Sequence, residues 1–319
     1  MSARQSVLCY VLILAIVGFL ASGVRAQTSI RIVVPVPPGG AGDIVARVLT
    51  EQVARAQGQA MVVENRPGAG TMIGTEAVAR AAPDGNTLLI TAPYLVIAPH
   101  LRKLSFDPLT GLEPICHLVS SPGVIVVNSA SPYRTLADFI AAARARPGEV
   151  TFAAAGPGTV QHVGFEMLRR AADASLIFVP YSGGAPAITA LLGGHVTAVF
   201  AEYAPLAEHI TAGRLRAIAT TTHARIDALP DVPTVAESYK DYEVDFWWGL
   251  FGPARIGRQT ASQFADGFTA AMKVPEINAK LLAQGFMPVG NGGADFGALL
   301  RKQYDSYGRI IREANIKSD

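Results

Sequence analysis

Residues 30–56 read IRIVVPVPPGGAGDIVARVLTEQVARA. The first five residues are a mostly apolar run of strand length, rich in β-branched side chains. Pro35 to Gly42 form a loop of prolines and glycines, and the apolar residues between Ile44 and Val53 recur at helical spacing. A short buried strand that leads through a loop into a helix is the repeating unit of α/β proteins. This stretch therefore predicts a parallel sheet that helices cover on both faces.

The same alternation continues along the chain in two series. The first series adds expected strands at 61–64 and 87–90. The second series starts with a strand at 124–127 and ends with one at 215–220. An aromatic strand over 244–251 follows, and three helices close the chain.

Two series of strands and helices predict two α/β lobes. The late aromatic strand is followed only by helices, so we expect the C-terminal part to return to the first lobe. Lobe one is then 27–125 together with 245–319, and lobe two is 126–244. The chain would cross between the lobes twice, which makes a hinge, and the cleft between the lobes is the expected ligand site.

The first 26 residues have the pattern of a secretory signal peptide. Arg4 precedes an unbroken apolar run from Val7 to Leu20, which is short for a helix that spans a bilayer. Val24-Arg25-Ala26 is a small-x-small site that a signal peptidase accepts. We expect cleavage after Ala26 and a soluble protein in the periplasm, with an uncleaved N-terminal anchor as the alternative.

The composition is typical of a folded protein with a small net charge. Hydrophobic residues make up 50% of the 319 residues and charged residues only 16%, which excludes disorder. The chain has 27 basic and 25 acidic residues, and removal of 1–26 takes away two arginines and no acid, which leaves 25 of each. No basic field is present for nucleic acid. Removal of Cys9 leaves Cys116 alone, which we expect to be a small buried hydrophobe without a disulfide.

The loop from Pro35 to Asp43 has the features of an anion-binding cradle. It follows the carboxyl end of a strand, where ligands of open α/β sheets bind. Its glycines let the backbone N–H groups at the helix start approach an anion. The expected contacts are Pro38, Gly39, Gly40, Ala41 and Asp43. Asp43 as the N-cap or hinge of the loop, and a tight turn without any ligand, are the alternatives.

Residues 156–162, which read GPGTVQH, repeat these features in lobe two. They follow a strand and open a helix, and Thr159 adds a hydroxyl group. The candidate contacts are Gly156, Gly158, Thr159 and His162, and the alternative for Thr159 is an ordinary helix N-cap. Two such cradles that face one cleft would hold a carboxylate from both sides.

Motifs for catalysis and metal binding are missing from the sequence. The six histidines are scattered, with neither H-x-x-x-H nor H-E-x-x-H spacing. No G-x-S-x-G, G-x-G-x-x-G or P-loop motif occurs. We expect no catalytic residue, no metal site and no cofactor, and we expect Trp247 and Trp248 to pack within their lobe.

The Gly-rich loops and several other segments resemble the Bug family, the extracytoplasmic solute receptors of tripartite tricarboxylate transporters. The resemblance covers essentially the whole chain after residue 26. Its markers are 38–43 (PGGAGD), 63–70 (VENRPGAG), 82–85 (APDG), 155–159 (AGPGT) with His162 and Glu166, 179–187 (VPYSGGAPA), 192–194 (LGG), 229–234 (LPDVPT) and 247–251 (WWGLF).

The resemblance implies a two-lobed, flytrap-like receptor with a type II-like periplasmic-binding-protein fold that closes on a small carboxylated solute. In the family, the loops that match 37–43 and 156–162 hold a carboxylate through backbone N–H groups and waters. The resemblance also assigns Tyr181 and Glu202 to the ligand site. It implies a monomer whose partners are membrane transporter subunits or a sensor protein.

Four departures from the family pattern leave both cradles intact. Thr197 stands where members usually carry an acid, and Ala201, beside Glu202, stands at a second such position. Arg255-Ile256-Gly257 replace the usual Gly-Thr-Pro, and Thr71 replaces the last glycine of a Pro-Gly-Ala-Gly-Gly turn.

These observations favour a periplasmic, non-enzymatic receptor for a small organic anion. The alternative is a cleft hydrolase of the α/β class that acts on a carboxylated substrate. A nucleophile and a base that converge in the cleft would favour that alternative.

Overall fold

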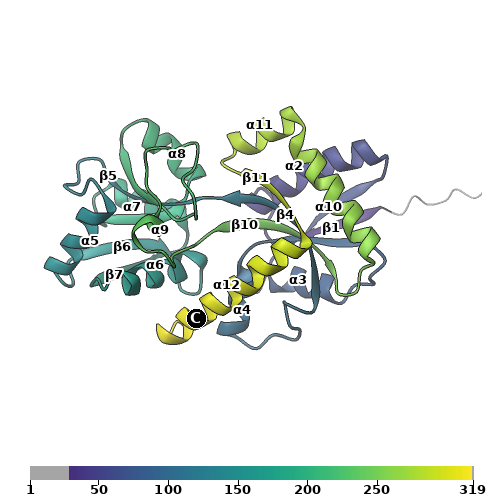
Figure 1. Ribbon diagram of the computed structural model, residues 1–319, viewed down its shortest axis with the longest axis horizontal. Coiled ribbons are helices and arrows are strands. Elements are labelled where there is room, and N and C mark those ends of the chain that lie inside the picture. Colours follow the sequence, from purple (N-terminus) through teal and green to yellow (C-terminus); the bar gives the residue numbers. More distant parts are fainter. Residues whose placement is uncertain (1–28, 318–319) are drawn as a thin grey trace, which may run out of the picture.

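The computed structural model describes residues 29–317 of the chain. The predicted signal peptide and its cleavage site lie outside this range. Within it, none of the helices is both long enough and apolar enough to cross a membrane. Two α/β lobes lie side by side, and each contains one sheet (Figure 1).

The first sheet has six strands in the order β11-β4-β10-β3-β1-β2. Its strands are β1 (Ile30–Val34), β2 (Met61–Asn65), β3 (Thr87–Thr91), β4 (Leu112–Ser121), β10 (Phe246–Pro253) and β11 (Met287–Gly292). The helices of this lobe are α2 (Ala41–Gln57), α3 (Met72–Ala79), α4 (Tyr94–Leu101), α10 (Arg258–Lys273), α11 (Pro275–Ala283) and α12 (Gly293–Glu313). The C-terminal part of the chain therefore returns to the first sheet.

The second sheet has five strands in the order β7-β6-β8-β5-β9. Its strands are β5 (Gly123–Asn128), β6 (Val150–Ala155), β7 (Leu176–Tyr181), β8 (Ala198–Glu202) and β9 (Leu215–Thr220). Its helices are α5 (Leu136–Ala145), α6 (Val160–Ala171), α7 (Gly184–Leu192), α8 (Ala204–Thr211) and the short α9 (Val235–Ser238).

The expectation of parallel sheets is only partly correct. β1, β2 and β3 pair in parallel, as do β6, β7 and β8, but β10 runs antiparallel to both β3 and β4. β5 runs antiparallel to β8 and β9. The strands that carry the chain between the lobes run against their neighbours, because one leaves the first lobe and the other returns to it.

Three elements of the first lobe were not expected from the sequence. β4 contains Glu113, Pro114 and His117, which hide its apolar run, and β11 contains a proline and two glycines. α4 carries Pro99 inside a helix, where proline removes a backbone donor. In each case tertiary packing overrides a weak local signal.

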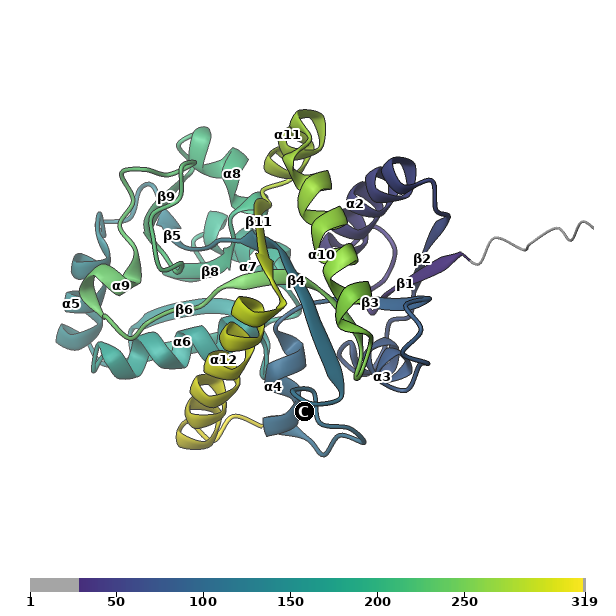
Figure 2. The ribbon, with the colours of Figure 1, turned by 45° about the vertical axis from the view of Figure 1, so that its right-hand side comes forward.

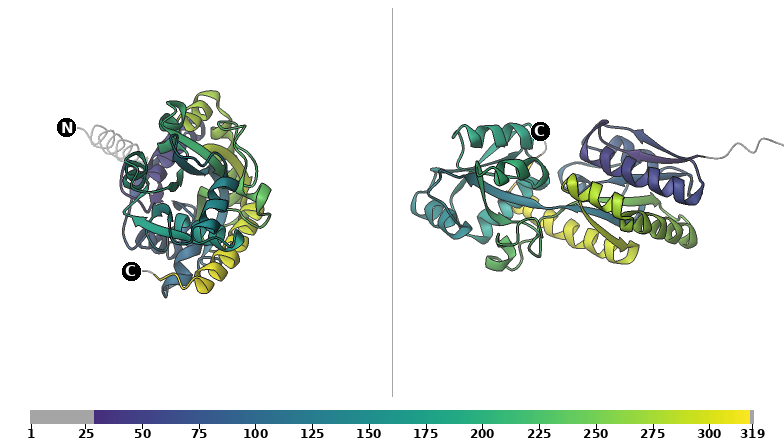
Figure 3. Two further views of the ribbon diagram at one scale, coloured as in Figure 1. Left: turned by 90° about the vertical axis from the view of Figure 1, so that its left-hand side faces the viewer. Right: turned by 90° about the horizontal axis from the view of Figure 1, so that it is seen from above.

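The chain crosses between the lobes at two places (Figure 3). The first crossing is Pro122, between the end of β4 and the start of β5. The second is the segment 239–245, which leads into β10. The crossings are tied together, because the Val244 N–H donates to the Thr221 carbonyl oxygen and the Thr221 N–H donates to the Gly123 carbonyl oxygen.

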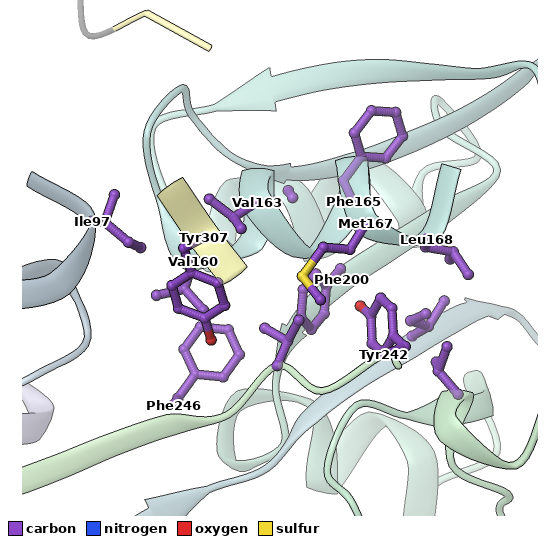
Figure 4. Packing of buried hydrophobic residues seen from close by; sticks show 14 of the residues in the cluster. Ile97, Val160, Val163, Phe165, Met167, Leu168, Phe200, Tyr242, Phe246 and Tyr307 are labelled. Carbon is purple, nitrogen blue, oxygen red and sulfur yellow. The ribbon is translucent and has the colours of Figure 1, made fainter. Parts of the chain in front are cut away.

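A hydrophobic cluster extends from one lobe into the other. Figure 4 shows Ile97 of α4 and Tyr307 of α12 beside Val160 of α6, with Phe200 and Phe246 close by. All five side chains are buried. The helices at this side of the molecule therefore join the lobes by apolar contact in addition to the two crossings.

Two departures from the family pattern fall on strained backbone positions. Thr71, at the N-cap position of α3, has φ 75°, and Arg255, between β10 and α10, has φ 69°. Left-handed conformations suit glycine and cost other residues, β-branched ones above all. The Thr71 hydroxyl is also buried without a hydrogen-bond partner among the described residues.

We predict that Thr71→Gly stabilises the protein. Removal of Cβ relieves a left-handed strain of roughly 1–2 kcal/mol, and the greater entropy of glycine in the unfolded chain offsets part of this gain. The free energy of unfolding, measured with urea, should rise by about 1 kcal/mol. Thr71→Ala keeps Cβ and should gain less. Equal stability of Thr71→Gly and wild type would show that the turn carries no strain.

Candidate ligand-binding loops

The first loop holds its shape through one left-handed glycine and one buried carboxylate. Gly39 has φ 80°, and the Gly40 N–H donates to the Pro37 carbonyl oxygen at 3.3 Å. α2 then begins at Ala41 with Gly40 as its N-cap residue. The alternative that Asp43 caps the helix is therefore wrong, because Asp43 is the third residue of the helix.

Asp43 instead ties the loop to the helix and to the neighbouring strand. Its carboxylate accepts hydrogen bonds from the Gly39 N–H, Arg47 Nε and Asn65 Nδ2, each at 2.9 Å. Asn65 ends β2, and its Nδ2 also donates to the Val36 carbonyl oxygen at 3.1 Å. Burial by itself would raise the pKa of Asp43, but these hydrogen bonds and the charge of Arg47 lower it below its ordinary value. Asp43 is therefore ionised and fixes the loop.

This network decides which amides of the first loop remain for a ligand. The Gly39 N–H is already used by Asp43, so Gly39 is not an amide donor as the loop stands. The first hydrogen bond of the helix joins the Ile44 N–H to the Gly40 carbonyl oxygen. The amides of Ala41, Gly42 and Asp43 thus form the first turn, whose N–H groups have no partner within a helix.

Gly42 lies against the ring of Trp248 on β10. A Cβ at Gly42 would come within 2.1 Å of Trp248 Cζ3. Trp248 is 9% exposed and Trp247 is fully buried, with Trp247 Nε1 donating to Gln303 Oε1 at 2.8 Å. The expectation that both tryptophans pack within the lobe is confirmed, and Trp248 also sets the position of the first turn of α2.

The second loop uses a helix cap in place of a buried carboxylate. Thr159 is the N-cap residue of α6, and its Oγ1 accepts the His162 N–H at 3.2 Å and donates to the Gly156 carbonyl oxygen at 2.8 Å. Gly158 has φ 73°. The Thr159 hydroxyl proton is thus engaged within the loop, and the Val160 and Gln161 amides are the unpaired donors of the first turn.

His162 is a neutral, stacked residue of this loop. Its Nδ1 accepts the Gly158 N–H at 3.3 Å, which places its proton on Nε2. The ring stacks on Phe178, with centroids 4.2 Å apart and an interplanar angle of 9°. Burial lowers the pKa of His162, and the negative charge of Glu166 opposes this shift only in part. Nε2–H is thus available to donate at neutral pH.

The remaining candidates lie along the same edge of the second sheet. Tyr181 ends β7 and pairs with Ala155 at the end of β6, directly before Gly156. Glu202 ends β8, and its Oε2 accepts the Ser121 hydroxyl at 2.7 Å beside the first crossing. Burial raises the pKa of Glu202, while the hydrogen bond from Ser121 lowers it.

Two of the departures lie at opposite ends of β8. Thr197 precedes β8 at the opposite end of that strand, where its N–H donates to Thr151 Oγ1 at 2.8 Å and the two hydroxyls lie 3.1 Å apart. Ala201 directly precedes Glu202 at the end of β8, and its side chain is buried in the core of the second lobe. Neither residue has a polar group at the sheet edge that carries Gly156.

The lobes meet beside the second loop. A Cβ at Gly158 would come within 2.7 Å of Leu101 Cδ1, at the end of α4 in the first lobe. This contact brings the second loop against the first lobe. The structure therefore places 38–43 on one lobe, 156–162 with Tyr181 on the other, and Glu202 next to the crossing.

The cysteine and the buried histidine of β4, within residues 29–317, are poorly suited to act as the nucleophile and the base of a hydrolase. Cys116 is fully buried, and burial raises the pKa of its thiol to about 11, so it is a packed hydrophobe as expected. His117 is buried against Phe296, and burial lowers its pKa to about 4. No group of three or more metal-binding side chains occurs in this part of the chain.

Asp245 is a second partly buried carboxyl group at the hinge. It directly precedes β10 and accepts a hydrogen bond from the Ser120 hydroxyl. Burial raises its pKa to about 7, the Ser120 hydrogen bond opposes the shift, and the charges of Glu243 and Glu202 raise it further. Beside each crossing, a carboxyl group thus accepts a hydrogen bond from a serine of β4.

Comparison with known proteins agrees with the family resemblance and with the two-lobed fold. The sequence model of the family described as "Tripartite tricarboxylate transporter family receptor" matches residues 45–316. The structure of the periplasmic binding protein BugD is 30% identical, with a TM-score of 0.72 and coverage of 91% of this chain and 99% of that one. These likenesses confirm the predicted two-lobed binding-protein fold.

Two further similar structures contain ligands. MatC (Rpa3494) from Rhodopseudomonas palustris, with bound malate, is 25% identical with a TM-score of 0.70, over 89% of this chain and 98% of that one. Rpa4515 from R. palustris, with adipate, is 26% identical with a TM-score of 0.75, over 91% and 98%.

We predict that Gly42→Ala destabilises the protein by roughly 1–3 kcal/mol, because the new methyl group overlaps the buried Trp248 ring. Gly184→Ala is the matched control, since it also adds a methyl group to the first turn of a helix, where the nearest atom is 3.8 Å away. Urea unfolding measures both. Equal stabilities of the two variants would contradict the contact.

A second prediction concerns pH. Asp245 keeps its proton up to about pH 7 in the folded protein but loses it near 3.8 when unfolded, so its contribution to stability falls as the pH rises from 4 through 7. The stability of Asp245→Asn relative to wild type should therefore rise as the pH increases from about 4 to about 7 and stay level above that. Urea unfolding across this range tests it, with the exposed Asp227→Asn as control. A stability difference that is independent of pH would refute the assignment.

Proposed function

Because the chain belongs to the tripartite tricarboxylate transporter receptor family, we propose that its two Gly-rich loops are the two halves of a carboxylate site. The family consists of solute-binding receptors, and its structurally similar member BugD is a periplasmic binding protein. In this proposal the protein is exported, captures a small organic anion between its lobes, and delivers it to a membrane transporter or a sensor. It acts as a monomer and catalyses no reaction.

The observation that carries the proposal is the pair of helix starts. α2 and α6 each begin at a Gly-rich loop at the carboxyl end of a strand, one on each lobe. The first-turn amides are Ala41, Gly42 and Asp43 in one loop and Val160 and Gln161 in the other. Amides at a helix start bind anions, because they lack helical partners and lie at the positive end of the helix dipole.

The charge of Asp43 does not oppose an anion at the first loop. Its carboxylate is paired with Arg47 at 2.9 Å and accepts two further hydrogen bonds. These contacts turn the negative group toward the protein and leave the amides to act on the ligand. Asp43 supports the site by holding the loop.

A small dicarboxylate is the proposed ligand class. Malate and adipate, which the two similar structures contain, both have two carboxylates. One carboxylate would occupy the amides of the two loops. His162 Nε2–H and the Tyr181 hydroxyl are the side-chain donors at the edge of the second lobe that could meet the other.

The hydrolase alternative gains no support from the similar proteins, which are binding proteins. Ser120 and Ser121 both donate to carboxyl groups, and neither accepts from or donates to a histidine in the described part of the chain. A hydroxyl paired with a carboxyl group lacks the histidine base that activates a serine nucleophile.

The first experiment identifies the ligand. Thermal-shift screening of the mature protein should use malate, adipate and other mono-, di- and tricarboxylates. A ligand present at 100 times its Kd stabilises the folded state by about 2.7 kcal/mol, which raises the melting temperature measurably. Stabilisation by dicarboxylates over monocarboxylates supports the proposed class.

We predict that Ala41→Pro weakens ligand binding at least about tenfold while the protein remains folded. Ala41 is the first residue of α2, where proline fits, and the preceding Gly40 is extended as a residue before proline must be. The change removes one amide donor, worth roughly 1.5–3 kcal/mol to a charged ligand. Titration calorimetry with the identified dicarboxylate measures the affinity.

Thr159→Val is the control for Ala41→Pro, because it disturbs the start of a helix without removing an amide donor. It removes the cap of α6, worth typically about 1 kcal/mol of stability, but keeps every amide donor. We expect a lower melting temperature with an affinity that falls much less than in Ala41→Pro. Wild-type affinity in Ala41→Pro would show that the first loop is not part of the site.

A further inference from the structure

A cavity of about 940 Å³ lies on the first lobe, away from the two loops. It forms where β11 ends beside β4. β11 pairs with β4 only from Cys116 to Ser120, so residues 112–115 of β4 continue without that neighbour. Figure 2 shows α10 and α12 on either side of β4, and the first turns of both helices line the cavity.

Three arginines line this cavity without an acidic partner. Arg255 comes from the loop after β10, Arg258 is the first residue of α10, and Arg301 lies in the third turn of α12. Glu113 and Asp266 also line the cavity, yet none of the three guanidinium groups forms an ion pair with any carboxylate of residues 29–317. Three exposed guanidinium groups gathered around one cavity therefore give its wall a positive charge that no ion pair within the described part of the chain cancels.

The backbone adds to the positive potential. α10 and α12 are 16 and 21 residues long, and neither helix has a side-chain cap at its start. Residues of both first turns, Arg258 and Gly293 among them, line the cavity, and the N–H groups of a first turn have no helical partner. Asp295 in the first turn of α12 offsets part of this potential.

Arg255 is held in place at a cost to the backbone. It has φ 69°, which suits glycine, and glycine is the residue that the family resemblance implies there. The neighbouring Ile256 is 5% exposed and anchors the loop in the core. The loop therefore places the exposed Arg255 beside the cavity.

We propose that this cavity binds a small multivalent anion, with two or more carboxylate or phosphate groups. A guanidinium group forms paired hydrogen bonds with either of these groups. Three such groups spread around one cavity match an anion with several charges better than a monovalent one. Leu112, Ile115 and Leu300 give the cavity an apolar floor that accepts a carbon skeleton. This site is independent of the carboxylate site of the two loops.

The test uses citrate and inorganic pyrophosphate as probes and acetate as the monovalent control. Titration calorimetry at low ionic strength should show binding of at least one multivalent probe and no binding of acetate at the same concentrations. A preference between citrate and pyrophosphate identifies the group that the arginines select. Absence of binding by both multivalent probes at millimolar concentration overturns the proposal.

Two variants locate the binding. Arg301→Gln and Arg258→Gln should each weaken the probe about tenfold or more. Arg134→Gln removes the same charge from an exposed position on the second lobe and should leave the affinity unchanged. If all three variants bind the multivalent probe with equal affinity, the anion responds only to the net charge of the protein, and the cavity is not its site.

Ala41→Pro separates this site from the proposed function. Multivalent anion binding should persist in Ala41→Pro if it occurs in the arginine-lined cavity. Loss of probe binding in Ala41→Pro, with normal binding in Arg301→Gln, would place the anion at the two loops. That result refutes the cavity proposal and leaves the carboxylate site of the loops standing.

Discussion

The first lobe depends on the burial of one strand that comes from the far end of the sequence. β10 is buried at all eight positions and lies between β3 and β4, so that it joins two parts of the lobe that would otherwise not pair. A strand with a neighbour on each edge and with both faces buried contributes most to the stability of a sheet. Each fully buried apolar side chain stabilises the fold by roughly 1.5–3 kcal/mol. The same strand brings Trp248 to Gly42 and follows Asp245 at the hinge. The first Gly-rich loop, the core and the hinge are thus linked through β10.

The two loops reach a similar geometry by different means. The first is held by an ionised carboxylate that binds an amide, an arginine and an asparagine from a neighbouring strand. The second is held by a threonine cap and a neutral histidine stacked on Phe178. In both cases side chains accept hydrogen bonds from amides of the loop, and the donors that remain unpaired are the amides of the first helical turn. In the proposed site, the backbone recognises the carboxylate, so the side chains around it are free to differ between receptors.

The hinge contains a cluster of polar side chains. Ser120 and Ser121 sit side by side at the end of β4, and each binds a carboxyl group, one from the second crossing and one from β8. Burial and mutual repulsion raise the pKa of Asp245 to about 7, so its protonation changes near neutral pH. In addition to the two crossings, the apolar contacts of α4 and α12 with α6 hold the lobes together. A hydrophobic contact and a polar hinge thus both join the lobes.

The sequence by itself determined the α/β class, the two series of strands, both Gly-rich loops and the family, because these features rest on local periodicity, glycine placement and ordered motifs. It also indicated the buried Cys116 and the packing of both tryptophans. It did not reveal β4, β11 or α4, where prolines and polar residues mask the apolar pattern. Only the tertiary structure decided that the crossing strands run antiparallel, that Asp43 ties the loop to Asn65 of β2, and that Gly42 must leave room for Trp248. It also decided that Arg255, Arg258 and Arg301 gather at one cavity. Each of these facts joins residues far apart in the chain, and no local pattern records a contact whose partner is supplied by another strand or helix.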